Sequence, residues 1–297
     1  MGLRSALDVL AASPPFERLL LARERPIVAR AGASEPFAIA GLAVALGGPI
    51  LAAAPGPREA ETLHADVAAF LGAEGVRLLP AWEALPYEGI SPSPEVAARR
   101  AEAARALRAA TGPFVLVAPA LAAMHGVVPT LGAAEPLVLA RGVESAPDAV
   151  VERLVDLGYT RSDVVEHRGE FAVRGGVLDV FGGTARRPVR LEYWGDEIES
   201  IREFSPSTQL STSAVAAIEL APVRELVLDD ALRARARSLA GSDAVSERHA
   251  ELLARVGDGL HPEGMESIAP LLFDRLQVPS ALLPPGAWVV VSDAVRT

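Results

Sequence analysis

The chain has 297 residues, a formal net charge of −10 and no cysteine. The length predicts roughly two domains of about 150 residues, with room for a third small one. The missing cysteine excludes disulfides, thiol catalysis and thiolate metal sites, and it agrees with the cytoplasmic location that we expect. All 28 basic residues are arginines, so no phosphate-loop lysine and no Schiff-base lysine is available.

Charge and hydropathy narrow the possible partners. Duplex DNA would be repelled over most of the surface unless a local basic patch exists. The most apolar stretch, Phe37 to Pro55, is interrupted by glycines and a proline, which predicts a buried helix followed by a buried strand. No signal-peptide pattern follows Met1. We therefore expect neither a leader peptide nor a membrane partner.

The first 125 residues alternate between helices and strands, after helices within 1–24 and a short apolar run at 27–29. Strands are predicted at 49–54, 76–79 and 114–117, and helices at 35–46, 58–71 and 95–110. Such alternation is typical of a parallel sheet covered on both faces. Gly32 to Leu46 stands where a nucleotide-binding domain carries its phosphate loop, but it has neither the glycine spacing nor Lys-Ser/Thr. It is either a vestigial loop of an inactive nucleotide-binding fold or an ordinary strand-to-helix connection.

The pattern changes at about residue 126. A strand at 136–139 and an amphipathic helix at 148–157 precede further predicted strands at 163–166, 170–181, 189–194 and 197–204. Gly195-Asp196 marks a hairpin turn between the last two strands. A helix that leans on successive antiparallel strands predicts a small α+β module over residues 126–211.

The last segment, 212–297, again mixes helices and strands. We predict a strand at 216–220, a helix from Asp229 or Asp230 to Ala240, a helix from Ser242 or Asp243 to Val256, and a buried strand at 287–291. The fold class is therefore α/β, with a small inserted α+β module.

The sequence lacks the residue patterns that are typical of a zinc site or of a serine hydrolase. The five histidines are scattered, which opposes a zinc site, and no Gly-x-Ser-x-Gly elbow supports a hydrolase. The many carboxylates are interpreted as solvated surface charge. The aromatic residues of the segment 82–87 are interpreted as packed loop anchors.

Residues 158–209 stand out because charged and aromatic side chains occupy fixed points on predicted strands without any group suited to bond breaking. On a strand from Glu170, Phe171 and Val173 would face one way and Ala172 and Arg174 the other. Gly175-Gly176 permits a bulge. Phe181, beside two glycines, is expected to be only partly covered. The stretch is interpreted as a docking surface.

Arg161 and Arg174 could share one face of this small sheet. Arginine and aromatic residues are enriched in interface hot spots. The alternative is that both arginines pair with acidic residues of the same module, namely Glu166, Glu170 or Asp179. Residues 161–204 hold seven arginines and nine acidic residues, a net charge of −2, which is a poor phosphate-binding face.

Three groups of residues in this stretch resemble, in order and spacing, a module shared by the excision-repair protein UvrB and the transcription-repair coupling factor Mfd: 159–161, 169–181 and 196–209. Segments 82–92 and, less specifically, 264–273 resemble the Mfd family, so the resemblance covers nearly the whole chain. UvrB proper is disfavoured because it carries a Gly-Lys-Thr phosphate loop and a long DNA-gripping hairpin. The chain most resembles the N-terminal UvrB-like region of the Mfd family, with domains 1a, 2 and 1b.

The resemblance implies a degenerate RecA-like, domain 1a-like fold for 1–125 and a UvrA-binding, UvrB domain 2-like module for 126–211. A domain 1b-like segment, 212–297, would pack back on the first domain. It implies a non-catalytic region, without a cofactor of its own, that binds UvrA by imitating UvrB and recruits nucleotide excision repair to stalled RNA polymerase. The full-length family protein is an ATP-dependent DNA translocase. Its other domains would bind ATP, magnesium, DNA and RNA polymerase, and its C-terminal region would mask the UvrA-binding surface.

By motif, the resemblance carries the UvrA contacts over to Arg161, Arg174 and Phe181. UvrB has an arginine where this chain has Ala172, which leaves a thinner or locally different contact set. The alternative function is a fragment of a UvrB-type ATP-dependent repair helicase, which the missing lysine disfavours. A general nucleic-acid-binding module is the third hypothesis, which the negative charge disfavours.

Overall fold

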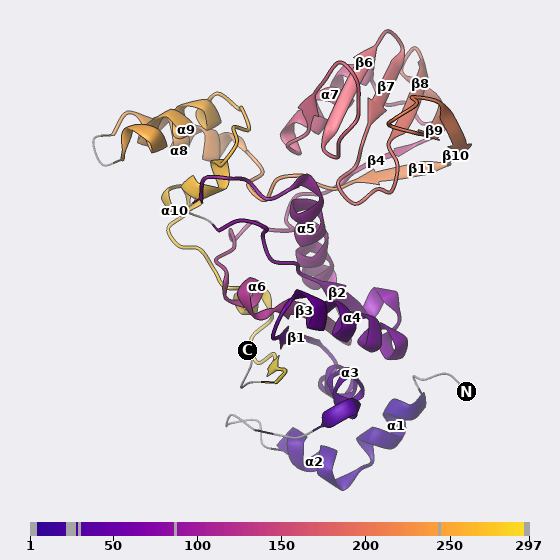
Figure 1. The fold of residues 1–297 in the computed structure, drawn as a ribbon, viewed down its shortest axis with the longest axis vertical. Coiled ribbons are helices and arrows are strands. Elements are labelled where there is room, and N and C mark those ends of the chain that lie inside the picture. The colour runs from indigo at the N-terminus through magenta and orange to yellow at the C-terminus, as the bar shows by residue number, and fades with distance from the viewer. Residues whose placement is uncertain (1–4, 22–27, 29–30, 86–87, 243–244, 294–297) are drawn as a thin grey trace. The chain divides into compact units, whose positions relative to one another are not determined.

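The computed structural model describes residues 5–21, 28, 31–85, 88–242 and 245–293 (Figure 1). The chain divides into two compact units, each assembled from segments distant in sequence. The first unit contains 1–81, 103–127 and 277–297, and the second contains 82–102 and 128–276. The predicted three-part division at 125 and 211 remains a prediction.

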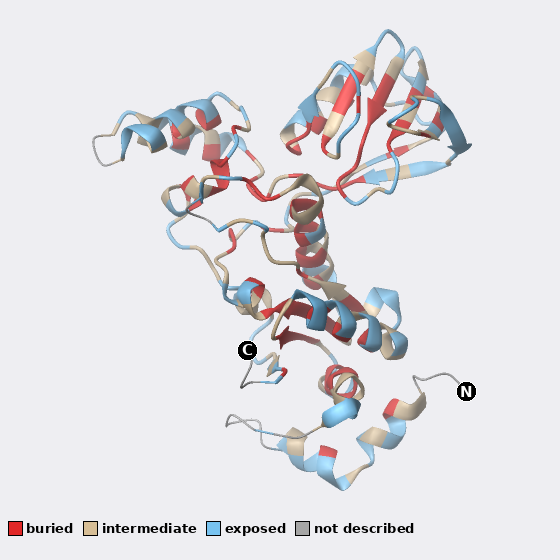
Figure 2. Cartoon of the chain, viewed as in Figure 1, coloured by how far each residue is buried: buried red, intermediate tan, exposed pale blue. Residues whose placement is uncertain are grey.

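The first unit is built around a four-stranded parallel sheet with strand order β12-β1-β3-β2. The strands are β1 (Pro49–Ala54), β2 (Val76–Leu78), β3 (Phe114–Pro119) and β12 (Val289–Val291). Strands β1 and β3 are buried along their whole length (Figure 2). The predicted parallel sheet is therefore confirmed.

The first unit contains helices that precede β1 or follow one of the strands β1, β2 and β3. They are α1 (Ala6–Ala11), α2 (Pro14–Leu21), α3 (Glu35–Leu46), α4 (Pro57–Leu71) and α6 (Ala120–Met124), with the second half of α5 (Pro94–Ala109). Side chains of β1 alternate between two cores. Ile50 packs in the cluster that contains Ile39 and Val67, whereas Leu51 packs in the cluster that contains Leu107. Both faces of the sheet are thus covered, as the alternating pattern predicts.

The edge strand of the first unit's sheet is more exposed than predicted. The predicted buried strand at 287–291 is wrong in its burial, because Val289 and Val291 are each about half exposed. Strand β12 lies at the edge of the sheet and pairs with β1 alone, so its other side has no strand to cover it. The short apolar run predicted at 27–29 falls largely outside the described residues.

The helices of the second unit are α7 (Pro147–Asp156), α8 (Asp230–Ala240), α9 (Glu247–Gly257) and α10 (Ala269–Leu272), with the first half of α5. The Asp229 side chain accepts a hydrogen bond from the Leu232 N–H and caps α8, as predicted. Helix α9 begins later than predicted, because Ser246 rather than Ser242 supplies its N-terminal cap. No helix among the described residues is long and apolar enough to cross a membrane.

The second unit also contains a six-stranded sheet of order β10-β9-β8-β7-β6-β5 and a two-stranded pair β11-β4. The strands are β4 (Leu137–Ala140), β5 (Thr160–Arg161), β6 (Glu170–Arg174), β7 (Val177–Val180), β8 (Val189–Trp194), β9 (Glu197–Phe204), β10 (Ser211–Ala214) and β11 (Ala217–Leu220). Helix α7 lies beside the larger sheet (Figure 1). The α+β character predicted for this region is confirmed.

Two strand predictions in this sheet are wrong. The segment predicted as one strand, 170–181, is a hairpin of β6 and β7, because the chain reverses at Gly175, whose φ of 59° suits glycine. The segment 163–166 is not a strand. It leaves the sheet after Arg161 and buries Val165.

A buried polar network joins distant segments of the second unit. Arg100 is fully buried and forms an ion pair with Glu225, which also accepts a hydrogen bond from the Trp82 indole. The Ser91 hydroxyl donates to Glu266 and accepts from the Gly264 N–H. Trp82 is thus the packed loop anchor expected from the sequence.

Candidate protein-docking site on the six-stranded sheet

The strand register assigns the side chains of the six-stranded sheet to two faces, because cross-strand partners lie on the same side and successive residues alternate. The core face carries a row that runs across β6 to β9 and packs with Val150 and Leu154 of α7: Val173, Leu178, Leu191 and Ile201. The opposite face, called the polar face here, carries the neighbouring row: Ala172, Asp179, Arg190 and Arg202. The alternation predicted for Phe171 to Arg174 is confirmed.

Asp179 is the centre of the polar face. Its side chain is 1% exposed. Its Oδ1 accepts a hydrogen bond from Arg190 Nε at 2.7 Å, and its Oδ2 accepts from Arg190 Nη2 at 2.8 Å and from Arg174 Nη2 at 2.6 Å. The hydrogen bonds from Arg190 to Asp179 raise the pKa of the Arg190 guanidinium. Two arginines therefore hold one carboxylate and leave an excess positive charge.

Arg174 keeps much of its surface in solvent despite this contact. Its side chain is 50% exposed, and it contributes one nitrogen to Asp179. The alternative that Arg174 pairs within the module is therefore correct for the free chain. A guanidinium has five N–H donors, so one bond to Asp179 orients Arg174 without exhausting its capacity for a second carboxylate.

Phe181 also belongs to the polar face, but it is covered. It is 7% exposed and packs with Val165, Ala172 and Phe204. The guanidinium carbon of Arg168 lies 4.9 Å from the centre of its ring. The expectation of a partly covered aromatic is wrong, because the segment 162–168 folds over this position.

Arg161 lies on the edge strand β5 and is exposed. Its register partner is Phe171, whose side chain belongs to the core face. Arg161 therefore lies on the face of the sheet opposite to the face that carries Arg174. The structure brings Arg174 and Phe181 to one face and leaves Arg161 at the edge.

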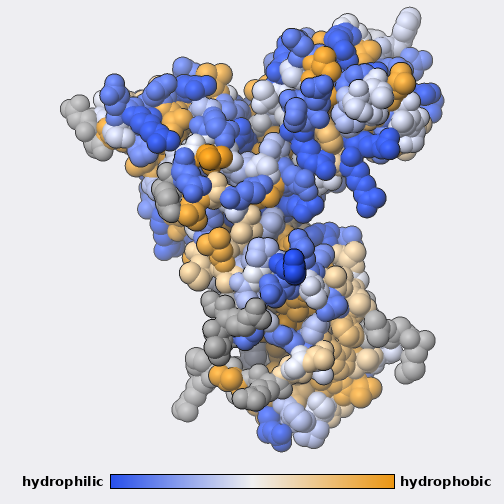
Figure 3. Space-filling model, viewed as in Figure 1, coloured by the Kyte–Doolittle hydropathy of each residue, from blue (hydrophilic) through white to orange (hydrophobic). Residues whose placement is uncertain are grey.

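The turns at one end of the sheet carry an exposed aromatic side chain. Trp194, at the turn between β8 and β9, is 80% exposed. The Tyr193 N–H donates to the Gly176 carbonyl, which ties this turn to the neighbouring turn after Arg174. The visible surface over the sheet is otherwise mostly hydrophilic (Figure 3). A tryptophan and an arginine therefore project from adjacent turns of a polar surface.

The sequence reasoning missed Arg168, Arg190 and Arg202 as parts of this surface. Alternation along β8 places Arg190 and Glu192 on one side, which could have been read from the sequence. The register between β7 and β8 depends on the path of residues 181–188, and the sequence does not reveal it.

Comparison with known proteins shows which protein family the chain is similar to. The family model described as "UvrB interaction domain" matches residues 137–226, which include the whole six-stranded sheet. Transcription-repair-coupling factors of Mycobacterium bovis and Mycobacterium tuberculosis are each 39% identical over 98% of this chain and 25% of their own length. The factor of Myxococcus xanthus is 37% identical over 82% of this chain and 21% of its length.

The chain belongs to the transcription-repair-coupling factor family. It spans about a quarter of the length of the curated relatives it matches. The resemblance inferred from residues 82–92, 159–209 and 264–273 is confirmed at the level of the family. That this quarter is the N-terminal one remains a prediction.

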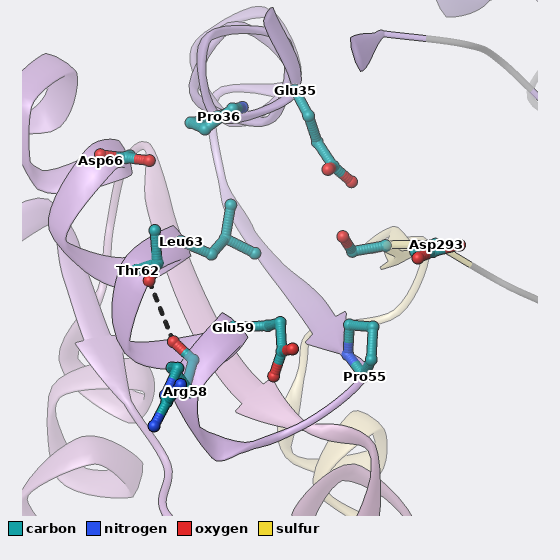
Figure 4. Close-up of a pocket in the computed structure, with 10 residues that line it drawn as sticks. Glu35, Pro36, Pro55, Arg58, Glu59, Thr62, Leu63, Asp66 and Asp293 are labelled. Carbon is teal, nitrogen blue, oxygen red and sulfur yellow. Dashed lines mark hydrogen bonds between the residues drawn. The ribbon is translucent and has the colours of Figure 1, made fainter. Parts of the chain in front are cut away.

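Acidic side chains surround the expected phosphate-loop position at the start of α3. A pocket of about 350 Å³ lies where α3 and α4 begin and where β12 ends, and Figure 4 shows the residues around it. Glu35, Glu59 and Asp293 approach it from these three segments, and Arg58 turns its guanidinium away from them (Figure 4). Carboxylates repel phosphate groups, so the pocket is poorly suited to a nucleotide.

Metal and acid-base chemistry have little support in this family member. Among the described residues, no three histidine or acidic side chains are grouped so that they could hold a metal ion. The strongest perturbations of acidity come from burial rather than from a catalytic cleft. Burial raises the pKa of Tyr193 to about 12 and, with Arg224 and Arg233 nearby, lowers the pKa of His261 to about 4.

Proposed function

We propose that this chain binds UvrA through the polar face of its six-stranded sheet and so recruits nucleotide excision repair to stalled RNA polymerase. The observation that carries the proposal is the coincidence of the UvrB interaction domain match with the sheet that presents Arg174 and Arg190 around Asp179. The chain itself would be non-catalytic and cytoplasmic. ATP, magnesium, DNA and RNA polymerase would be bound by parts of the family protein outside it.

Arg174 suits the centre of such a contact. Its planar guanidinium can pair with a carboxylate through two parallel hydrogen bonds. Because Asp179 already holds the Arg174 side chain in place, this side chain loses less conformational freedom when a partner binds. Phe181 would act from beneath, because its ring supports Arg168 and fills the space under the segment 162–168. Arg161 would contact UvrA only if the partner also wraps around the β5 edge.

The test is a titration of purified UvrA with the chain and three charge-reversal variants, each checked for folding by circular dichroism. Arg174→Glu should weaken binding by about 2 kcal/mol, which is roughly thirtyfold. Arg161→Glu measures the contribution of the sheet edge. Arg255→Glu on α9 is the matched control, because it changes the charge equally at an exposed position outside the sheet.

Two results would count against the proposal. An unmodified chain that does not bind UvrA contradicts the function. Full affinity in both the Arg161 and Arg174 variants leaves the function standing and contradicts the site.

A further inference from the structure

Arg202 occupies an unfavourable place in the free chain. It is the register partner of Arg190 on β9, so two guanidinium-bearing residues face each other across adjacent strands. Like charges directly opposite one another destabilise a sheet. On the other side of Arg202, the register partner in β10 is Ala214, which offers no charge. The two register partners of Arg202 therefore offer its positive charge no opposite charge to pair with.

The acidic side chains near Arg202 on the polar face are engaged elsewhere. Asp179 accepts both Arg174 and Arg190. Glu192 accepts a hydrogen bond from the Ser200 hydroxyl at 2.7 Å. Glu203 lies on the opposite face, because its register partner Val189 packs in the core, and it accepts a hydrogen bond from Ser213 at 2.8 Å. Among the residues that the structure describes, none forms an ion pair with Arg202. Its charge is therefore available to a group from outside the chain.

Arg202 lines a hollow in the surface of the second unit. A depression of about 670 Å³ lies over β8, β9 and β10, and Arg202, Arg141, Glu192 and Glu199 line it. The Arg141 guanidinium is fixed on its rim by a hydrogen bond from Nε to the Glu199 carbonyl at 3.1 Å. The hollow borders the polar face at Glu192 and Arg202, and Ile201, whose side chain belongs to the core, also lines it. It is large enough for a side chain or a short segment of a partner.

We propose that Arg202 and this hollow are a second recognition point for a carboxylate side chain of the partner protein that covers Arg174. This inference rests on the proposed function, because it assigns a further contact to the same docking surface. A protein carboxylate fits better than a nucleic-acid phosphate, because residues 161–204 carry a net charge of −2 and the whole chain −10.

Replacing Arg202 should change stability and binding in opposite directions, which replacing a purely structural residue would not do. Replacing it with glutamine removes one of two opposed cations, so the free chain should keep or raise its melting temperature. The same change should weaken binding, because the partner carboxylate loses its counter-charge. A residue needed only for folding would lower stability and affinity together.

The experiment is a calorimetric titration of UvrA with the chain and its Arg202→Gln, Arg174→Gln and Arg255→Gln variants, at low and high salt. We expect Arg202→Gln to lower affinity about tenfold, to flatten the salt dependence and to leave the melting temperature unchanged or higher. Arg255→Gln should match the unmodified chain. A parallel titration with duplex DNA tests the nucleic-acid alternative.

The outcomes separate the two proposals. Loss of affinity in Arg174→Gln with full affinity in Arg202→Gln overturns this inference and keeps the proposed function. Loss of DNA affinity instead of UvrA affinity in Arg202→Gln also overturns it. An unmodified chain that does not bind UvrA overturns both.

Discussion

His261 is a histidine that the fold keeps neutral. Burial, together with the nearby charges of Arg224 and Arg233, lowers its pKa to about 4, and Asp156 acts in the opposite direction. Because the folded-state pKa lies below the ordinary value of 6.5, the unfolded chain takes up a proton first when the pH falls. Stability linked to His261 is therefore full above about pH 6.5 and is lost between that pH and about pH 4.

We predict that His261→Gln reduces the loss of stability between pH 7 and pH 5 by about 2 kcal/mol. Glu266 works in the other direction, because burial raises the pKa of its carboxyl and its protonation stabilises the fold as the pH falls. Comparing the two chains at each pH cancels that contribution. Denaturant unfolding of both chains measures the difference, and His167→Gln at an exposed position is the control. Equal pH dependence in the unmodified and His261 chains would refute the assignment.

Residues of the docking surface could be named from sequence more readily than their surroundings. The alternation of Phe171 to Arg174 follows from strand geometry alone, and the structure confirms it. The burial of Phe181 could not be foreseen, because it depends on Val165 from a segment that leaves the sheet. Arg202 could not be singled out from the sequence, because its position opposite Arg190 depends on how β8 pairs with β9.

At the scale of elements, one glycine controls how two distant loops meet. Gly264 has a φ of 77°, and a Cβ added there would lie 2.3 Å from the Gly89 carbonyl oxygen. The Gly264 N–H also donates to the Ser91 hydroxyl. The segments 82–92 and 264–273, which resemble the same family separately, are thus joined by direct backbone contact.

Gly264→Ala should cost about 3 kcal/mol of unfolding free energy, because the strain of a positive φ adds to a clash with the backbone. Gly142→Ala is the matched control, since its φ is 76° and nothing lies within 4 Å of an added Cβ. That variant should lose about 1 kcal/mol. Denaturant titration of both variants measures the difference, and similar losses would mean that the close approach of Gly89 contributes nothing.

Strand and helix positions were largely predictable, and strand partners were not. Helix α3 and strand β1 have the predicted bounds, because hydrophobic runs and glycine or proline stops mark them locally. The hairpin at Gly175 was predicted as a single strand, because a glycine pair permits either a bulge or a reversal. Strand β10 was not predicted, because its short polar sequence shows no alternation.

At the scale of the whole molecule, charge is distributed unevenly. The chain carries −10, and the pocket at the start of α3 and α4 gathers Glu35, Glu59, Asp66 and Asp293 around a single cation, Arg58. The polar face of the second unit instead concentrates arginines. The parallel sheet was predictable from alternating elements, but its order β12-β1-β3-β2 brings together strands far apart in sequence.

We predict that the chain neither hydrolyses nor measurably binds ATP. With magnesium and about 1 mM ATP, the gain in stability should stay below about 0.4 kcal/mol, the value expected when free ligand equals Kd. Thermal unfolding and a phosphate-release assay measure the two properties. A hydrolysis rate above background that disappears in Glu35→Gln or Asp293→Asn would restore the helicase alternative.

We infer that Asp179 makes the polar face more selective among anionic partners than its arginines alone would be. Because Arg174 and Arg190 already hold a carboxylate, an incoming anion must compete with an internal one at close range. A lone phosphate would meet the negative charge of Asp179 as well as the arginines, whereas a partner that contacts the whole face would share Arg174 with Asp179 and gain further interactions. On this inference, the buried carboxylate disfavours small anions on the polar face and favours a protein that contacts all of it.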